Sequence, residues 1–316
     1  MVKQNKATFK NMKKFFNYIA WVTLTFCTVA CSQEDLTYSY LSDSKAVHIS
    51  AQIGENNVSG GFQTRSNPFD REEQKLTKFN TGDKISVGTS DQNAITYTLD
   101  NNGTWTPEAN KYLKWTSDNM LFKAYYPADK NSASINNFTV PTSYNSINDL
   151  ADADYMTYSE TQSNTSGNGI TLSLKRKMAR LIILINSYGN QFNNNGYKVS
   201  KITIHSNTKG YNESGVVKEN TQVTAYKYDG TTFYALLSPN TADTEADFLT
   251  VELTETGSAS RPVMTTLKVK GIPTTNAGKS YVIRLIIGKD KAGIKGVTVS
   301  DWEEGTLPDG EATEKQ

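Results

Sequence analysis

Short stretches in which apolar and polar residues alternate recur along the chain after residue 44. In residues 45–53, every second position from Val47 to Ile53 is apolar and the positions between them are polar. This period of two is typical of a strand that is buried on one face. The same pattern, or a short apolar run bounded by turn residues, predicts further strands at 84–89, 94–99, 112–115, 120–126, 137–140, 155–159, 170–174, 197–206, 222–228, 232–237, 248–254, 262–270, 280–288 and 295–302.

One run is apolar at nearly every position. Residues 178–186 contain five large aliphatic residues in a row, from Leu181 to Ile185. Such a run suits a strand that is covered on both faces, and a buried helix fits the same residues. The β-branched content and the flanking Asn186 and Gly189 favour the strand.

The spacing of these stretches predicts an all-β fold. Turn signals such as Asp100-Asn101-Asn102-Gly103 separate the strands, and no helical periodicity lies between them. Strands about 8 to 12 residues apart with such turns are typical of a β-sandwich. We expect one short helix or helical turn near residues 146–153.

The longest polar break after residue 80 is residues 161–169, which are rich in Gly, Ser and Asn. We predict a domain boundary there, with one sandwich over residues 66–168, completed by the strand 45–53, and a second over residues 169–316. A chain of this length has room for two cores of ordinary size. Residues 54–80 hold Gly60-Gly61, Pro68 and a charged cluster, so we expect them to be an exposed loop.

An apolar run of another kind lies near the start of the chain. It covers 15 residues, from Phe15 to Val29, and follows Lys13 and Lys14. A helix that spans a bilayer needs about 20 apolar residues, so this run is too short. The pattern predicts an export signal over residues 1–30, for which Met12 is the more natural start.

The two cysteines of the chain, Cys27 and Cys31, both lie in or next to this run. The rest of the chain therefore has no thiol pair for a disulfide or a metal site. Thr28-Val29-Ala30-Cys31 resembles a bacterial lipobox, which implies that Cys31 carries a lipid such as palmitate and becomes the first residue of a lipoprotein. Thr28 replaces the usual Leu, and an ordinary secretory signal cut near Ala30 is the alternative. Residues 31–65 would then form a lipidated N-terminal segment that ends after the first strand.

The charge balance argues against nucleic acid as a partner. Of the 33 basic residues, five lie in the leader, which leaves 28 against 32 acidic residues and a net charge of −4. Binding to nucleic acid depends on a basic surface that neutralises phosphates. The 17 tyrosines and the many Thr, Asn and Ser residues instead suit a secreted β-protein.

Motifs of enzyme chemistry are absent from the sequence. Its two histidines, His48 and His205, stand at alternating strand positions, and no Gly-x-Ser-x-Gly, His-Glu-x-x-His, phosphate-binding loop or dinucleotide fingerprint is present. Asp149, Asp152 and Asp154 have oxygen ligands for Ca²⁺, but they lack the pattern of an EF-hand and fit solvated loop acids better. We expect no catalytic residue, metal or cofactor.

Three aromatic residues form a candidate ligand platform. Trp105, Tyr112 and Trp115 lie close together in sequence and could present their rings to a sugar or a peptide. The alternative is that these rings fill the core, since each buries about 150 to 250 Å². The platform would suit a glycan-binding surface lipoprotein of a nutrient-uptake system, which is the second functional hypothesis.

Seven short motifs in order resemble the fimbrillin-like lipoproteins of Gram-negative anaerobes. They are Gly82-Asp83-Lys84-Ile85-Ser86-Val87, Gly103-Thr104-Trp105, Tyr112-Leu113-Lys114-Trp115, Phe122-Lys123-Ala124-Tyr125-Tyr126-Pro127, Asp152-Ala153-Asp154-Tyr155-Met156, Leu174-Lys175-Arg176-Lys177-Met178-Ala179-Arg180-Leu181 and Val299-Ser300-Asp301-Trp302. Arg176 stands where the family often has His. The resemblance implies two transthyretin-like β-sandwiches and a role as a type V pilus subunit in adhesion.

The resemblance also implies a route of assembly. The lipoprotein is anchored in the outer membrane at the cell surface, an Arg-specific protease cuts after the first strand, and a strand of another pilus subunit fills the vacated groove. In this sequence the removable strand would be 45–53, and the cut would follow Arg65, with Arg71 as the second choice. A host protein or glycan receptor would be a further partner.

The donor strand is expected in the C-terminal region, at 295–302 or 305–316. The stretch 305–316 is short and polar and contains Pro308, so it is a poor donor. This favours a tip or accessory role over a stalk role.

Overall fold

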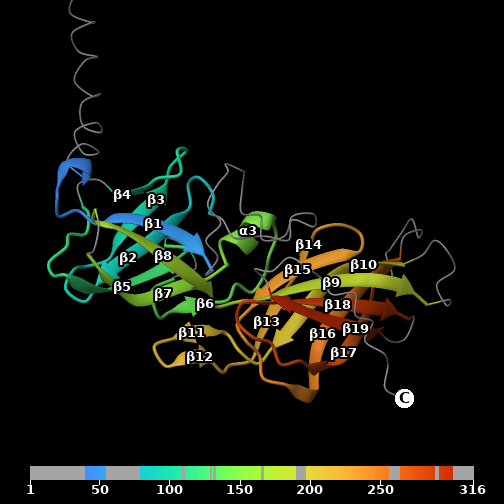
Figure 1. Cartoon of the computed structure of the whole chain (residues 1–316). Coiled ribbons are helices and arrows are strands. Elements are labelled where there is room, and N and C mark those ends of the chain that lie inside the picture. Colours follow the sequence, from blue (N-terminus) through green and yellow to red (C-terminus); the bar gives the residue numbers. More distant parts are fainter. Residues whose placement is uncertain are drawn as a thin grey trace, which may run out of the picture.

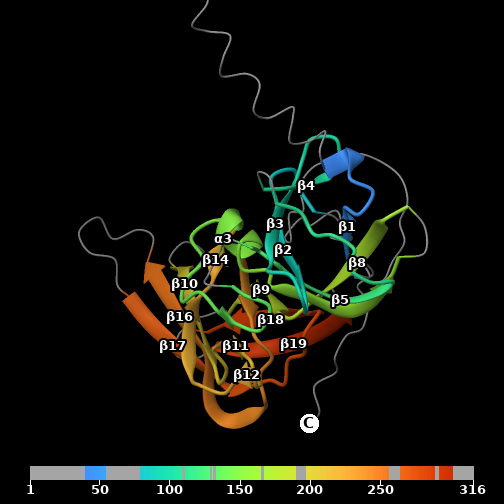
Figure 2. The same ribbon diagram turned by 90° about the vertical axis from the view of Figure 1, so that its left-hand side faces the viewer.

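The computed structural model describes residues 40–54, 79–108, 111–128, 130, 133–164, 167–189, 197–255, 264–288 and 292–301. These residues form two hydrophobic cores, which lie side by side (Figures 1 and 2). Nearly every element is a strand, as the alternating sequence pattern predicted. Within this part of the chain, no helix combines the length and apolar character needed to cross a bilayer.

The N-terminal half is a seven-stranded sheet in the order β1-β8-β7-β5-β2-β3-β4. Only β1 and β8 in this sheet are parallel. The strands are β1 (His48–Ile53), β2 (Lys84–Thr89), β3 (Ile95–Leu99), β4 (Trp105–Pro107), β5 (Asn119–Tyr126), β7 (Met156–Ser163) and β8 (Gly169–Arg176).

This sheet folds over on itself around one core. β7 and β8 share only two residue pairs, Met156 with Arg176 and Thr157 with Lys175, so β8 separates from β7 along most of its length. At the other end of the sheet, Ala46 forms a bridge with Lys114, which follows β4. Side chains from β1 and β8 therefore share a core with those of β2, β3 and β5.

The C-terminal half is a sandwich of two sheets. One has the order β13-β10-β16-β17 and the other β14-β15-β9-β18-β19. The first comprises β13 (Thr221–Thr224), β10 (Tyr197–Ser206), β16 (Asp243–Glu255) and β17 (Met264–Ile272). The second comprises β14 (Tyr226–Lys227), β15 (Thr232–Leu237), β9 (Ala179–Tyr188), β18 (Lys279–Ile287) and β19 (Ala292–Asp301).

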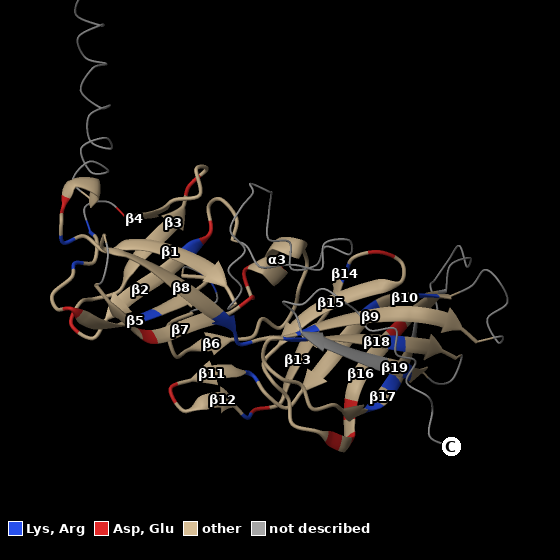
Figure 3. Ribbon diagram, viewed as in Figure 1, with Lys and Arg blue, Asp and Glu red and all other residues tan. Residues whose placement is uncertain are grey.

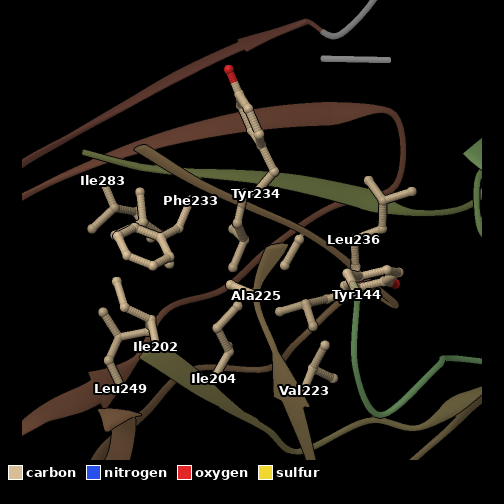
Figure 4. Close-up of a cluster of buried hydrophobic side chains, with 14 of the residues drawn as sticks. Tyr144, Ile202, Ile204, Val223, Ala225, Phe233, Tyr234, Leu236, Leu249 and Ile283 are labelled. Atoms are coloured by element: carbon tan, nitrogen blue, oxygen red, sulfur yellow. The ribbon is translucent and has the colours of Figure 1, made fainter. Parts of the chain in front are cut away.

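The core of the sandwich forms because the strands alternate. Figure 4 shows Phe233 from one sheet pointing toward Ile202 and Leu249 from the other, while Tyr234, the next residue, points away from them. One segment joins both sheets, since residues 221–224 pair with β10 and residues 226–227 pair with β15. Ala225 lies between them, and its N–H donates to the carbonyl of Ile202 at 2.9 Å.

The apolar run 178–186 is β9, so the preference for a strand over a helix is confirmed. Its burial is uneven: Leu181 and Ile183 are fully buried, whereas Ile182 and Leu184 are half-buried. The strand therefore faces the core on one side and is only partly covered on the other.

A small sheet and a short helix pack on the C-terminal core. The sheet is β12-β11-β6, made of β12 (Gly215–Val217), β11 (Gly210–Asn212) and β6 (Phe138–Thr139). The helix is α3 (Ile147–Ala151), at the expected place, because Ser146 and Asp149 form a capping box at its start. Leu150 of this helix belongs to the C-terminal core.

The division between the two cores does not fall at the predicted boundary of residues 168 and 169. β8 lies beyond that boundary, yet it belongs to the N-terminal sheet, and Phe138, Tyr144 and Tyr155 lie before it but pack in the C-terminal core. The polar break 161–169 includes the turn between β7 and β8, where Gly167 and Asn168 adopt positive φ. An exposed turn within a sheet has the same polar composition as a linker between domains. The polar residues 161–169 therefore indicated a domain boundary where the chain only turns from β7 to β8.

Candidate functional site: the seat of the first strand

β1 completes the N-terminal core although it comes from the start of the described chain. Its six residues pair in parallel with β8, from His48 opposite Gly169 to Ile53 opposite Leu174. Ile49 and Ile53, with Val47 just before the strand, are at most 6% exposed and belong to the N-terminal core, while Ser50 faces solvent. Burial of each such side chain stabilises the fold by about 1.5 to 3 kcal/mol.

The backbone around β1 is hydrogen-bonded on two sides. Toward β8, the N–H groups of His48 and Gly54 donate to the carbonyls of Asn168 and Leu174, each at 2.9 Å. On the opposite side, the N–H of Val47 donates to the carbonyl of Leu113 at 2.9 Å. The first residues of the segment therefore fill a gap between β8 and residues 113–115, which we call the seat of β1.

An ion pair fastens the segment at its start. Asp43 lies 2.7 Å from the Nζ of Lys114, and the hydroxyl of Tyr112 donates to the same carboxylate at 2.8 Å. The backbone N–H of Lys45 donates to its other oxygen at 2.8 Å. Hydrogen bonding to Lys114 is the largest cause that lowers the pKa of Asp43 to about 2. We call these three side chains, Asp43, Tyr112 and Lys114, the Asp43 clasp.

Aromatic contacts add to the clasp. The ring of Tyr40 lies 5.0 Å from that of His48 and 5.4 Å from that of Tyr112, between ring centroids. The hydroxyl of Tyr40 donates to the carbonyl of Val47 at 3.2 Å. His48 is thus used in packing around β1.

The walls of the seat are apolar and their edges are backbone. Leu113, Trp115, Leu172 and Leu174 belong to the core that β1 covers. Without β1, these side chains and the strand edge of β8 would lose their cover. An apolar slot bordered by unpaired N–H and C=O groups is the kind of site that accepts an added strand.

The candidate aromatic platform does not lie on the surface. Trp105 is 3% exposed and Trp115 is 6% exposed, and both pack in the N-terminal core, Trp115 edge-on against Phe122 at 5.5 Å. The indole N–H of Trp115 donates to the carbonyl of Asn168 at 3.3 Å. The platform prediction is therefore corrected: these rings fill the core because they stand at inward-facing positions, and Tyr112 belongs to the clasp.

The three aspartates weighed as Ca²⁺ ligands have separate roles. Asp149 caps α3, Asp152 lies 3.5 Å from Lys130, and Asp154 is buried against Arg176, with 2.9 Å between Oδ2 and Nε. In the part of the chain that the structure describes, no group of three or more His, Cys, Asp or Glu side chains is placed to hold a metal ion. His205, the other histidine, is bonded to Thr250 across two strands.

Several proposed site residues lie outside the described residues. They are Cys31, Arg65 and Arg71, which precede or follow the described segment 40–54. Sequence reasoning missed the Asp43 clasp, because Asp43 and Lys114 are far apart in the chain and neither belongs to a recognisable motif.

Charges of both signs are mixed along the chain. In Figure 3, Lys and Arg residues lie among Asp and Glu residues in both halves. A single-sign stripe of the kind that tracks a nucleic-acid backbone is not seen among the residues coloured in this view.

Known structures share this fold at low sequence identity. A putative cell adhesion protein from Bacteroides ovatus superposes with a TM-score of 0.54 at 15% identity, over 82% of this chain and 98% of that one. A putative cell adhesion protein from Bacteroides uniformis gives a TM-score of 0.52 at 18% identity, over 81% of this chain and 99% of that one. The comparison with curated proteins gave no match.

Family membership follows from the sequence itself. A family model described as fimbrillin-like matches residues 64–302, which is most of the chain and spans both cores. The chain therefore belongs to the fimbrillin-like family.

Proposed function

We propose that this protein is a non-enzymatic fimbrial subunit for adhesion, exported as a lipoprotein and assembled at the cell surface by strand exchange at the seat of β1. The observation that carries the proposal is the position of β1, which covers an apolar slot and is fastened mainly by β8 and the Asp43 clasp. Family membership supports the same class of function.

In this proposal, β1 holds the place of a donor strand until the subunit assembles. Arg65, with Arg71 as the second choice, lies between β1 and β2 in the chain, so a cut there separates β1 covalently from the rest of the fold. The remaining links are noncovalent. A strand from another subunit that places apolar side chains where Val47, Ile49 and Ile53 lie would restore both the core and the hydrogen bonds of β8.

Cys31 lies on the same side of the proposed cut as β1. A lipid on Cys31 would hold the uncut chain at the outer membrane, and the cut would release the folded body from that anchor. The partners are accordingly an Arg-specific protease, the outer membrane before the cut, and other pilus subunits after it. The polar stretch 305–316 with Pro308 makes a poor donor strand, which favours a tip or accessory role.

The proposal is tested by treating the purified full chain with an Arg-specific protease and comparing it with the variants Arg65→Ala and Arg71→Ala. We expect one early cut, prevented by one of the two substitutions, followed by SDS-resistant ladders on a denaturing gel. General degradation without a discrete product, or a discrete product that retains β1, would contradict assembly by strand exchange. Loss of β1 without ladders would assign the donor strand to a different subunit, as the tip role predicts.

A further inference from the structure

A polar groove of about 350 Å³ opens at one end of the four-stranded sheet in the C-terminal half. This volume lies at the low end of the range for sites that bind small molecules, about 300 to 1,000 Å³. It forms where β10 and β17 end and where β13 and β16 begin. The side chains that line it include His205, Asn220, Gln222, Asp243, Asp247 and Ile272.

An irregularity in the sheet lies at the groove. Asp243 of β16 pairs with Ile272 of β17, and the next pair is Asp247 with Lys270, so residues 244–246 stand opposite Gly271 alone. Gly271 adopts a φ of +92°, which favours glycine. Such bulges bend a strand and redirect its side chains, and they are often found beside functional sites.

A buried hydrogen-bond network fixes the wall of the groove. The Oδ1 of Asn240 accepts from the hydroxyl of Ser206 at 2.6 Å and from the N–H of Asn207 at 3.2 Å, and Asn240 and Ser206 are both at most 4% exposed. The amide of Asn207 makes two further bonds with the backbone of Thr241, at 2.6 and 3.1 Å. A wall held in this way does not need to be ordered when a ligand binds.

The rim keeps both donors and acceptors for a ligand. The amide groups of Asn220 and Gln222 make no hydrogen bond to any residue that the structure describes, and both side chains are exposed. Asp243 uses Oδ1 for the N–H groups of Glu245 and Ala246, each at 3.1 Å, which leaves Oδ2. Thr250 contacts Nε2 of His205 at 2.7 Å, which leaves Nδ1.

The acidic charge of the groove is partly offset. Asp247 lies 2.5 Å from Nζ of Lys268, which offsets its charge. Burial is the largest cause that lowers the pKa of His205, so its ring is neutral at neutral pH. The floor includes the apolar side chain of Ile272, which is 5% exposed.

We propose that this groove binds one saccharide unit of a neutral glycan through its hydroxyl groups. A hydroxyl both donates and accepts, so a polyol matches the mixed amides, carboxylate and imidazole of the rim. A primary ammonium only donates and would leave the amide N–H groups unused. The small exposed part of Ile272 offers an apolar contact for the C–H face of a sugar ring. The inference goes beyond strand exchange, because the groove lies in the C-terminal half and β1 in the N-terminal half.

The test is saturation-transfer NMR on the full chain with methyl α-mannoside, methyl β-galactoside and N-acetylglucosamine, and with Nα-acetyl-lysine amide as the ammonium probe. At least one sugar is expected to give a signal. The double substitution Asn220→Ala/Gln222→Ala should weaken its binding about three- to tenfold, the value of one or two hydrogen bonds. Both positions are exposed, so the fold is retained.

Asn101→Ala is the matched control, since Asn101 is an exposed amide in the turn between β3 and β4. It should leave sugar binding unchanged. The proposal would be overturned if none of the three sugars gives a saturation-transfer signal, or if the double substitution does not alter sugar binding. Binding of the lysine probe alone would also overturn it. Ladder formation in the same double variant would show that assembly is intact, so a failure here is distinct from a failure of strand exchange.

Discussion

Oppositely charged side chains that pair in this protein differ sharply in how far they are buried. Arg176 and Asp154 have side chains that are 1% and 5% exposed, whereas Lys209 and Glu219 form a pair of similar length with 44% and 55% exposure. Water screens the second pair, and it does not reach the first. The same ion-pair geometry therefore has different consequences at the two places.

Asp154→Ala is expected to destabilise the protein by about 3 to 5 kcal/mol, because it leaves the Arg176 guanidinium buried without its carboxylate. Glu219→Ala is the matched control and should change the free energy of unfolding by at most about 1 kcal/mol. Urea denaturation monitored by tyrosine and tryptophan fluorescence measures both. Equal effects of the two substitutions would show that burial does not govern the Asp154 pair.

Asp83 is a half-buried carboxylate, and its environment is unfavourable for charge. Burial is the largest cause that raises its pKa to about 6, and Asp154 and Asp152 add repulsion. Asp83 accepts from the N–H of Asn80 at 2.7 Å and from the hydroxyl of Tyr126 at 3.3 Å. The Tyr126 hydroxyl also lies 3.5 Å from the carbonyl of Ala151 in α3. Asp83 thus lies at the contact between the two halves.

Asp83→Asn is expected to stabilise the protein at pH 7.5 by about 1 to 3 kcal/mol. The folded state binds the Asp83 proton at higher pH than the unfolded chain does, so the wild-type protein loses stability as pH rises from about 4 to about 6. Asn has no proton to lose. Its amide oxygen can still accept from Asn80, and its NH₂ can donate to the Tyr126 hydroxyl.

Urea denaturation between pH 4.5 and 7.5 measures this effect. As pH rises, the free energy of unfolding of Asp83→Asn should fall less than that of the wild type, because Asn at this position loses no proton. The control Asp118→Asn, at an exposed site, should show the same fall as the wild type. A variant that is less stable than the wild type at pH 7.5 and declines in parallel with it would contradict the account of Asp83.

At the scale of elements, the small sheet β12-β11-β6 depends on one glycine. A Cβ on Gly210, which has a φ of +154°, would lie 1.9 Å from the carbonyl oxygen of Phe138. Gly210 and Tyr211 pair with Thr139 and Phe138, and the ring of Phe138 stacks on that of Tyr155 at 4.8 Å. No side chain fits at residue 210 without separating β11 from β6.

Gly210→Ala should therefore lower the free energy of unfolding by more than about 3 kcal/mol. It should also reduce the near-ultraviolet circular dichroism of the stacked aromatic rings. Gly215→Ala is the matched control: its φ is +106°, but nothing lies within 4 Å of the added Cβ. Backbone strain alone should lower the free energy of unfolding of Gly215→Ala by about 1 kcal/mol. The account of the small sheet is wrong if both variants lose the same stability.

β1 is the element on which the proposed function depends, and the Asp43 clasp is its local fastening. Asp43→Asn removes the charge that Lys114 contacts, so β1 should open more often. We expect faster hydrogen exchange for the amides of residues 47–53 and unchanged exchange in β18. If residues 47–53 of Asp43→Asn exchange at the wild-type rate, β8 holds the strand without help from the clasp.

The clasp also has a pH dependence. Its carboxyl has a lowered pKa of about 2, so its contribution is present above the unfolded-state pKa of about 4 and is lost as pH falls toward 2. In the wild-type protein, exchange in residues 47–53 should therefore rise selectively in acid. Asp43→Asn should remove this selective rise.

Local features of the fold could be predicted from sequence, and long-range features could not. β2 and β15 have the predicted bounds, since alternation and flanking turns are encoded within each segment. The stretch 112–115 forms only the bridge of Lys114 with Ala46, because whether an apolar stretch pairs depends on distant residues. The same reason explains why β8 was assigned to the wrong half and why the clasp was missed.

At the scale of the whole molecule, each half contains one parallel pair of strands, β1 with β8 and β9 with β18. The second pair lies inside its sheet, since β15 and β19 flank it. The first pair lies at the end of the N-terminal sheet, and β1 is joined to β2 only through the segment that contains Arg65 and Arg71. Replacement of β1 would leave the C-terminal sandwich unchanged, so the account predicts that a subunit accepts its partner's strand at the N-terminal half.

The most direct test of that account is a disulfide that locks β1 to β8. Ser50 and Thr171 are opposite each other in the parallel register and both are exposed, so Ser50→Cys/Thr171→Cys should cross-link without altering the core. A Cys27→Ser/Cys31→Ser background removes the other thiols, and Ser50→Cys alone is the control. After the Arg-specific cut, the oxidised double variant should form no SDS-resistant ladders, and reductant should restore them. Ladders formed by the fully cross-linked protein would contradict exchange of β1.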